Sequence, residues 1–315
     1  MPQEAEQNKY KDLMDRLETG IEEVFSSEKY RTYLSVMSRF HNYSFRNSLL
    51  IMLQRPESTH VAGFTAWRDK FHRSVNRGEK GIQILAPAPY RIRMEVEKPD
   101  ETGKLRKEEV EVIKPSFRPA YVFDVGQTSG EPLPVLVEDL SGNVSRYQAL
   151  FESLKSVSPF PIVMETLSGG VKGYCDLANR KIAICSGMSE VQTLKTTVHE
   201  ITHADLHAMP SKLAVETKDR HTKEVEAESV AFVVCSHFGI DTSEYSFSYL
   251  ASWSSNKELK ELKSSLETIQ VQAGDLIDRI DRKFLELAKN QERETADSIK
   301  FDMDIDLDRE KTQKQ

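Results

Sequence analysis

The chain has 315 residues, of which 38% are hydrophobic and 30% are charged, and its net charge is −7. This composition is typical of a globular protein, the length predicts about two domains, and the acidic balance excludes a uniformly basic nucleic-acid-binding protein. No apolar run reaches the roughly 18 residues of a membrane span, and the polar N-terminus is not a secretory signal. We therefore expect a cytoplasmic protein that does not contact a membrane.

The charge is distributed unevenly along the chain. Between Arg46 and Arg93 nine basic residues stand against three acidic ones, whereas the end of the chain is acidic. Such asymmetry can indicate a nucleic-acid-binding face on one domain. The three cysteines form no C-x-x-C pair, which fits a reducing compartment and predicts neither a disulfide nor thiol catalysis.

The first part of the chain is predicted to contain helices followed by strands. Apolar periodicity predicts helices over 8–35, 45–53 and 64–71, and strands over 81–87 and 120–125. A charged insert around Lys98–Lys107 is expected to be mobile. Turn-forming residues over 126–134 predict a linker.

The second part is predicted to begin with strands and to end in helices. Strands are expected over 161–166, 173–177 and 181–185, and helices from Ser189, over 223–238 and over 256–290. The helix that begins after Ser189 has a predicted buried stripe of Val191, Leu194, Val198 and Ile201. The predicted domains are 1–134 and 135–290, followed by a disordered acidic tail over 291–315.

Residues 199–203 read His-Glu-Ile-Thr-His within a predicted helix. Imidazoles at positions i and i+4 lie on one helix face and can share one metal ion. Glu200 would then lie beside the metal as the general base of a hydrolase. A surface helix with unrelated histidines is the alternative interpretation, and the helical context favours the metal site.

A catalytic site of this type needs a third protein ligand. Leu206 and Met209 exclude the metzincin pattern, and His207 is rotated away from His199 on the helix. The stronger candidates are Glu224 and Glu228, which share one face of the next predicted helix. A solvated acidic helix start is the alternative interpretation for either glutamate.

Residues 173–253 resemble the gluzincin-type metallopeptidase domain of the ImmA/IrrE and ArdC antirestriction group. The stretches that carry this resemblance are GYCDLANRKIAIC, TVHEITHADLHA and EVEAESVAFVVCSHFGID. The resemblance implies a small antiparallel sheet, one Zn²⁺ per chain on His199, His203 and Glu224, and a supporting role for Glu228 at a ligand imidazole. Another register would make Glu228 the ligand, and Mn²⁺ or Co²⁺ would also suit these donors.

The N-terminal part resembles the ArdC N-terminal domain. The relevant stretches are FRNSLLIML, GFTAWR, VNRGEKGIQI and PAYVFDV. This resemblance implies binding of single-stranded DNA without sequence preference. The two resemblances together cover about residues 8 to 285 and imply an α+β fold, with a helical and stranded DNA-binding domain before the metallopeptidase-like domain.

Candidate DNA-binding residues lie in the basic N-terminal part. Arginine and lysine side chains could follow a phosphate backbone, and Trp67, with Tyr43 and Phe64, could stack on bases. The basic candidates are Arg46, Arg68, Arg73, Arg77 and Lys80. The alternative interpretation is that Trp67 and Phe64 belong to the core and that the cations form a solvated face.

The sequence therefore predicts a single-stranded-DNA-binding antirestriction protein of a mobile element that carries a metallopeptidase-like domain. One alternative is an ImmA-type regulatory metalloprotease that cleaves a repressor or another protein. A second alternative is a DNA-binding protein whose metal is structural. The intact Glu200 argues against the second alternative, because folding alone would not require it.

Overall fold

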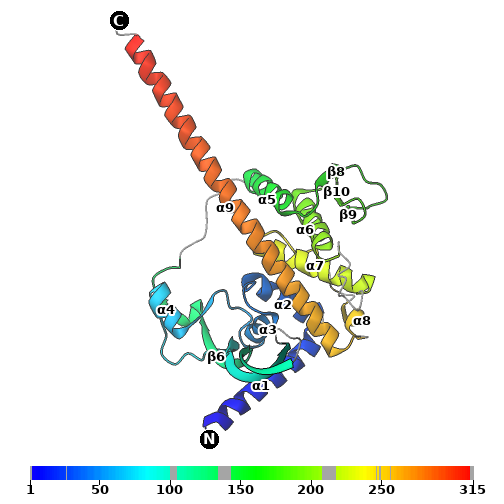
Figure 1. Ribbon diagram of the computed structural model, residues 1–315. Helices are drawn as coiled ribbons and strands as arrows, with labels where there is room; N and C mark the ends of the chain where they lie inside the picture. The colour runs from blue at the N-terminus through cyan, green and yellow to red at the C-terminus, as the bar shows by residue number, and fades with distance from the viewer. Residues whose placement is uncertain are drawn as a thin grey trace. The chain divides into compact units, whose positions relative to one another are not determined.

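The computed structural model divides into two compact units, Met1–Pro134 and Val135–Gln315, shown in Figure 1. It describes residues 2–25, 27–99, 105–133, 143–207, 218–245, 247, 250–255 and 257–312. The division between the units follows the turn-rich stretch over 126–134. Among the described helices, none has both the length and the apolarity needed to cross a membrane.

Unit 1 combines four helices with strands, in line with the predicted α+β class. The helices are α1 (Pro2–Val24), α2 (Ser27–Arg39), α3 (Phe45–Gln54) and α4 (Phe64–Phe71). The strands are β1 (Val61–Gly63), β2 (Arg73–Val75), β3 (Ile82–Pro87), β4 (Tyr90–Pro99), β5 (Leu105–Lys114), β6 (Phe117–Asp124) and β7 (Thr128–Gly130), with a 3-10 turn, η1 (Val125–Gln127), before β7. The helix predicted over 8–35 is therefore two helices, α1 and α2.

The central sheet of unit 1 has the order β1-β6-β3, with antiparallel neighbours. Ile82 and Ile84 of β3 and Val122 of β6 are buried on one face, which follows from the two-residue alternation of a strand. β3 is an edge strand, and amide side chains of α3 cover its edge. Asn47 donates to Leu85 O at 3.0 Å and accepts from Leu85 N at 2.9 Å. Gln54 likewise donates to Gln83 O at 2.8 Å and accepts from Gln83 N at 2.9 Å.

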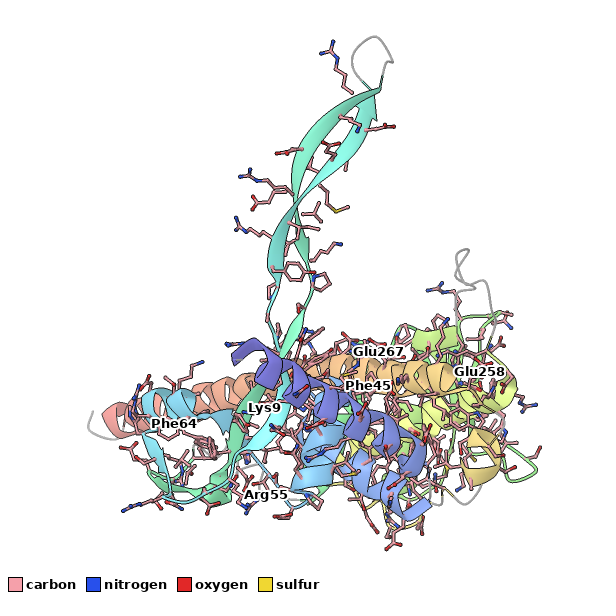
Figure 2. All side chains as sticks on the ribbon, turned by 90° about the horizontal axis from the view of Figure 1, so that it is seen from below. Lys9, Phe45, Arg55, Phe64, Glu258 and Glu267 are labelled. Atoms are coloured by element: carbon pink, nitrogen blue, oxygen red, sulfur yellow. The ribbon has the colours of Figure 1, made fainter. Side chains whose placement is uncertain are left out.

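Strands β4 and β5 form a long antiparallel hairpin that projects from the rest of unit 1 (Figure 2). The pairing runs from Tyr90 opposite Lys114 to Pro99 opposite Leu105. We expected an insert around Lys98–Lys107, and its described residues belong to the ends of β4 and β5. The charged residues alternate with Ile92, Met94 and Val96, and such alternation is a strand pattern that the count of charges obscured.

The predicted linker over 126–134 is also partly wrong, because its first half is folded. β7 pairs with β2, and Gln127 is buried in η1. Asp124 caps η1 and also accepts from the backbone N–H groups of Thr59 and His60. The turn-forming residues therefore build a compact corner, and residues beyond 133 lie outside the described part.

Unit 2 is a small sheet beside a group of helices. Its strands are β8 (Ile162–Glu165), β9 (Gly173–Asp176) and β10 (Lys181–Cys185). Its helices are α5 (Asn143–Val157), α6 (Glu190–His207), α7 (Arg220–His237), α8 (Leu250–Ser254) and α9 (Leu259–Thr312). The sheet order is β8-β10-β9, so β9 lies at an edge.

The sheet of unit 2 is mixed and not wholly antiparallel as expected. β9 and β10 form the predicted antiparallel hairpin, but β8 pairs with β10 in parallel. The chain crosses from the end of β8 to the start of β9 at the same end of the sheet, β9 runs back, and β10 returns between them parallel to β8. A sequence pattern of strand lengths does not encode strand direction.

Helix α6 buries Leu194, Val198 and Ile201, but Val191 is exposed, which corrects the predicted stripe at its first member. Ser189 accepts from Gln192 N at 3.3 Å, so it provides the N-terminal half of the expected capping box. The Gln192 side chain does not complete that box, because its Oε1 accepts from Lys172 at 2.8 Å and its amide nitrogen donates to Thr196 Oγ1.

Helix α9 packs on α5 and α7 and continues beyond them as one helix (Figure 1). Its Arg279 pairs with Asp205 of α6 and donates to Val157 O, and Gln272 donates to Asp205 Oδ2 at 2.8 Å. These contacts fix the end of α6. Residues 291–312, part of the stretch predicted to be disordered, have a helical backbone and contain neither glycine nor proline to end the helix.

Candidate metal centre

The candidate metal centre lies where α6 passes α7. His199 and His203 are one turn apart on α6, and both are half-buried. Their Nε2 atoms lie 3.0 Å from each other, so the two imidazoles converge on one point. This arrangement follows from the i, i+4 spacing, because such residues share a helix face.

Glu224 of α7 completes a group of three. Its Oε2 lies 3.5 Å from His199 Nε2 and 3.5 Å from His203 Nε2. One ligand atom from each of these residues falls within 4.8 Å of the others. A tetrahedral zinc ion about 2.0–2.1 Å from each ligand would hold such atoms about 3.3 Å apart, so the three donors fit one ion.

Glu228 contacts the other nitrogen of His199. Its Oε2 lies 3.3 Å from His199 Nδ1, one turn along α7 from Glu224. A carboxylate in this position orients a ligand imidazole and directs its Nε2 lone pair toward a metal. The geometry therefore separates the two glutamates, which the sequence left open, with Glu224 at the point of convergence and Glu228 behind His199.

The electrostatics of the cluster follow from this packing. Burial lowers the pKa of His199, but Glu224 and Glu228 outweigh that effect and raise it to about 9. The same contacts with His199 and His203 hold the pKa of Glu224 well below its ordinary value. Since ligand imidazoles bind metals in the neutral form, a metal that binds here must displace a proton.

Glu200 is buried on α6 and lines a cavity of about 290 Å³ together with His199 and Glu228. Burial raises the pKa of Glu200, while His199 and His203 act in the opposite direction. A carboxylate with a raised pKa beside a metal site is suited to accept and return a proton.

The start of α7 positions Glu224. Asp219 is the N-cap, and its Oδ1 accepts from Thr222 N at 2.7 Å. Its other oxygen accepts from Lys257 at 2.7 Å. Capping of this kind fixes the first turn of a helix and therefore the residues one turn further on.

The other histidines considered at the sequence level lie elsewhere in the helices. The His207 ring lies 5.3 Å from the His203 ring at a tilt of 50°, and burial lowers the pKa of His207 to about 4, but the group of three does not include it. His221 lies in the first turn of α7.

The predicted DNA-binding residues of unit 1 are only partly available for binding. Trp67 is 1% exposed and donates to Phe123 O at 2.8 Å, so the prediction that it stacks on bases is wrong. Arg73 donates to Thr128 and to backbone oxygens of the β7 region, and these bonds hold it within the fold. Arg68 pairs with Asp69 at 2.6 Å.

Arg46, Arg77 and Lys80 remain solvent-accessible, with Arg46 half-buried and the others exposed. Arg77 and Lys80 lie in the turn between β2 and β3. The buried amide of Gln127 fixes this turn by donating to Lys80 O at 2.9 Å and to Glu79.

Sequence reasoning missed a row of aromatic side chains on β6, in which Phe117 and Tyr121 are exposed and Phe123 is half-buried. Phe117, Tyr121 and Phe123 alternate on one face, and Phe64, labelled in Figure 2, meets Phe123 edge-on at 6.3 Å. Phe117, Tyr121 and Phe64 are 44%, 48% and 56% exposed. The alternation Phe-x-x-x-Tyr-x-Phe was the available signal. We call these four residues the aromatic row.

The N-terminal part of the chain is similar to a known protein domain. Residues 4–123 match the sequence model of the N-terminal domain of anti-restriction factor ArdC. A protein of Bacillus anthracis named "Uncharacterized protein pXO2-81/BXB0111/GBAA_pXO2_0111" is 28% identical over 329 residues, which cover 94% of this chain. The chain spans 55% of the length of that relative.

Two solved structures of the antirestriction ArdC protein from plasmid R388 are also similar. The metal-free structure shares 18% identity at a TM-score of 0.44, covering 76% of this chain and 85% of that chain. The Mn(II)-bound structure shares 16% identity at the same TM-score, covering 76% and 84%.

Proposed function

We propose that unit 2 is a metal-dependent peptidase domain that binds one divalent ion through His199, His203 and Glu224. The convergence of their ligand atoms within 4.8 Å carries this proposal. Two imidazoles and one carboxylate are a donor set of catalytic zinc sites, so Zn²⁺ is the expected ion, with Mn²⁺ and Co²⁺ as competitors.

The residues of the chain would share the chemistry as follows. A bound divalent ion supplies Lewis acidity and lowers the pKa of a coordinated water toward 7. Glu200 accepts the proton of the attacking water at its carboxylate and returns it to the leaving amide nitrogen. Glu228 keeps His199 oriented through Nδ1.

The free edge of β9 is suited to hold an extended peptide. Gly173 of β9 lines the same cavity as His199 and Glu200. An edge strand pairs main chain with main chain, so it selects an extended segment and not a folded surface. Position 173 has no room for a side chain, because a Cβ on Gly173 would lie 2.7 Å from Thr196 Cγ2.

Metal analysis of the purified full chain tests the site. We expect close to one equivalent of metal in the wild type and far less in His199→Ala or Glu224→Ala. Glu228→Ala is the matched control on the same helix, since loss of a supporting carboxylate typically weakens metal binding by about 10–100-fold without abolishing it. Full occupancy in Glu224→Ala would contradict the ligand assignment.

Cleavage is tested separately from metal binding. Metal-loaded wild type and Glu200→Gln are incubated with restriction proteins, phage-type repressors and a proteome digest, and the peptides are compared by mass spectrometry. Identical maps would favour the alternative of a structural metal. Cleavage confined to a repressor would favour the regulatory-protease alternative.

We also propose that unit 1 binds single-stranded DNA on the aromatic row and its basic border. Exposed aromatic side chains stack on bases of any sequence, and neighbouring cations neutralise phosphates. Lys80 precedes Gly81, whose Cα approaches so closely that an added Cβ would lie 3.0 Å from Tyr121 Cβ. The backbone next to Lys80 therefore passes beside the row, and the exposed Lys80 is the cation that we propose to contact phosphates there.

The salt dependence of binding tests this proposal. For the full chain and a fluorescent oligonucleotide, log affinity should fall with log salt by about 0.7 for each phosphate neutralised. Lys80→Ala and Arg77→Ala should each reduce that slope, whereas Arg68→Ala, whose guanidinium is paired with Asp69, should change it less. Absence of binding at low salt would overturn the proposal.

Together, these activities would serve antirestriction, in which a protein protects DNA that enters a cell on a mobile element. The match of residues 4–123 to the ArdC N-terminal domain supports this role. Transfer of a plasmid into a restricting host, compared between wild type, Glu200→Gln and Tyr121→Ala, would assign the protection to one unit or to both.

A further inference from the structure

The cavity beside the metal centre extends away from the ligands toward a buried lysine. Besides His199 and Glu200, its lining includes Lys195 of α6 and Tyr245 of the segment after α7. Lys195 lies four residues before His199, so both side chains project from the same face of α6. The lysine and the candidate ligand therefore open into one space.

Lys195 is unusual for a lysine because its side chain is only 9% exposed. Its Nζ lies 4.3 Å from the centre of the Tyr245 ring. The carboxylate partner is Glu244 at 3.8 Å, and the Glu244 side chain is 79% exposed. Among the residues that the structure describes, the Lys195 ammonium makes no hydrogen bond, although it carries three donors.

A buried ammonium with unused donors is stabilised when an anionic oxygen reaches it. The other carboxylates of the cavity already have partners, since Glu228 lies 3.3 Å from His199 and Glu200 interacts with His199 and His203. The second lysine of the lining, Lys172, donates to Gln192 at 2.8 Å. Lys172 is exposed, so Lys195 is the buried cation of this lining that an entering group meets.

We propose that this cavity is a specificity pocket for an acidic residue of the substrate, with Lys195 binding its carboxylate. The inference rests on the proposed peptidase function and adds the substrate class. The substrate carboxylate replaces the exposed Glu244 as the partner of Lys195, and the Tyr245 ring continues to contact the Lys195 ammonium. A segment with Asp or Glu next to the cleaved bond is the preferred substrate.

Binding of two matched probes tests the pocket without requiring turnover. Both probes are short peptides that carry a metal-binding hydroxamate, and they differ only in a neighbouring residue, glutamate in one and glutamine in the other. Dissociation constants are measured by calorimetry on the zinc-loaded full chain. A hydrogen bond to a charged group is worth about 1.5–3 kcal/mol, so we expect the glutamate probe to bind roughly 10–150 times more tightly.

Variants then assign the preference to one side chain. Lys195→Met, which retains the packing over Tyr245, should make the two probes equal, and Lys195→Arg should keep the preference. Lys155→Met on α5 removes one positive charge elsewhere in unit 2 and should change nothing. Metal content and thermal unfolding of each variant establish that it is folded and loaded.

The outcomes distinguish this inference from the proposed function. If the loaded wild type binds both probes equally, the acidic pocket is wrong and the metal site stands. If Lys195→Met is folded and loaded yet retains the preference, the pocket is also wrong. A wild type that takes up no metal overturns the proposed function and this inference with it.

Discussion

The two units build their candidate sites from the chain in different ways. In unit 2 the three candidate ligands lie on two consecutive helices, α6 and α7, and a spacing of four residues already aligns two of them. In unit 1 the aromatic row joins alternate residues of β6 to Phe64, which lies more than 50 positions earlier in the sequence. The first site depends on helix periodicity and the second on sheet register.

This difference predicts that metal acts on one unit only. The chain has two tryptophans, and each is buried in a different unit, Trp67 in unit 1 and Trp253 in unit 2. Zinc at 1,000 times its dissociation constant should add about 4 kcal/mol to the free energy of unfolding of unit 2. In Trp67→Phe, where Trp253 reports on unit 2, zinc should move the midpoint of urea unfolding to higher urea. In Trp253→Phe, where Trp67 reports on unit 1, zinc should leave the midpoint unchanged.

His199→Ala is the control, because its Trp253 transition should be insensitive to zinc. If zinc shifts both transitions equally in the two variants that retain His199, the prediction that metal acts on one unit only is wrong, because the units would then unfold together. A chelator should reverse the shift completely.

The aromatic row provides the corresponding test in unit 1. Tyr121→Ala should weaken binding of single-stranded DNA by about 1–3 kcal/mol, the value of one stacked base, and leave zinc binding unchanged. Trp67→Phe is the matched control, because it removes a buried hydrogen bond to the backbone oxygen of Phe123 and leaves all four side chains of the aromatic row in place. That variant should lose stability, by about 1 kcal/mol, and retain its DNA affinity.

These tests bear on how much of each site the sequence could predict. The candidates His199, Glu200 and His203 could be predicted from their spacing within a predicted helix, because helix geometry fixes their relation. Glu224 and Glu228 could not be separated by spacing, since the crossing of α6 and α7 decides which carboxylate meets the Nε2 atoms. Lys195 was not identified, because a lysine in a helix gives no sign that it is buried.

The errors in unit 1 have a related cause. Trp67 resembled a stacking residue, but the partner that buries it, Phe123 O, belongs to a strand formed by residues far away in the sequence. The β4–β5 hairpin was missed because its charged side chains concealed the alternation with apolar ones. Local periodicity predicted the helices α3 and α4 to within a residue or two, whereas strand pairing and direction required the fold.

The smallest expected effect concerns the residue that fixes the start of α7. Lys257, and then the backbone of Thr222, hold the pKa of Asp219 well below its ordinary value, so the folded state favours the ionised carboxylate. A lowered folded-state pKa contributes stability above the ordinary value of about 4, and the contribution is lost as the pH falls through the folded-state value. Asp219→Ala should cost about 1 kcal/mol at pH 7, a typical N-cap value, and the difference from wild type should shrink below about pH 4.

Asp219→Asn separates the two roles of this side chain, because asparagine still caps the helix but cannot pair with Lys257. Asp219 is half-exposed, so solvent screens the ion pair, and the cap should account for most of the loss. We therefore expect Asp219→Asn to retain most of the wild-type stability when unfolding of the metal-free Trp67→Phe protein is followed by Trp253. If Asp219→Asn loses as much as Asp219→Ala, the ion pair and not the cap positions Glu224, and high salt should then destabilise the wild type to the same extent.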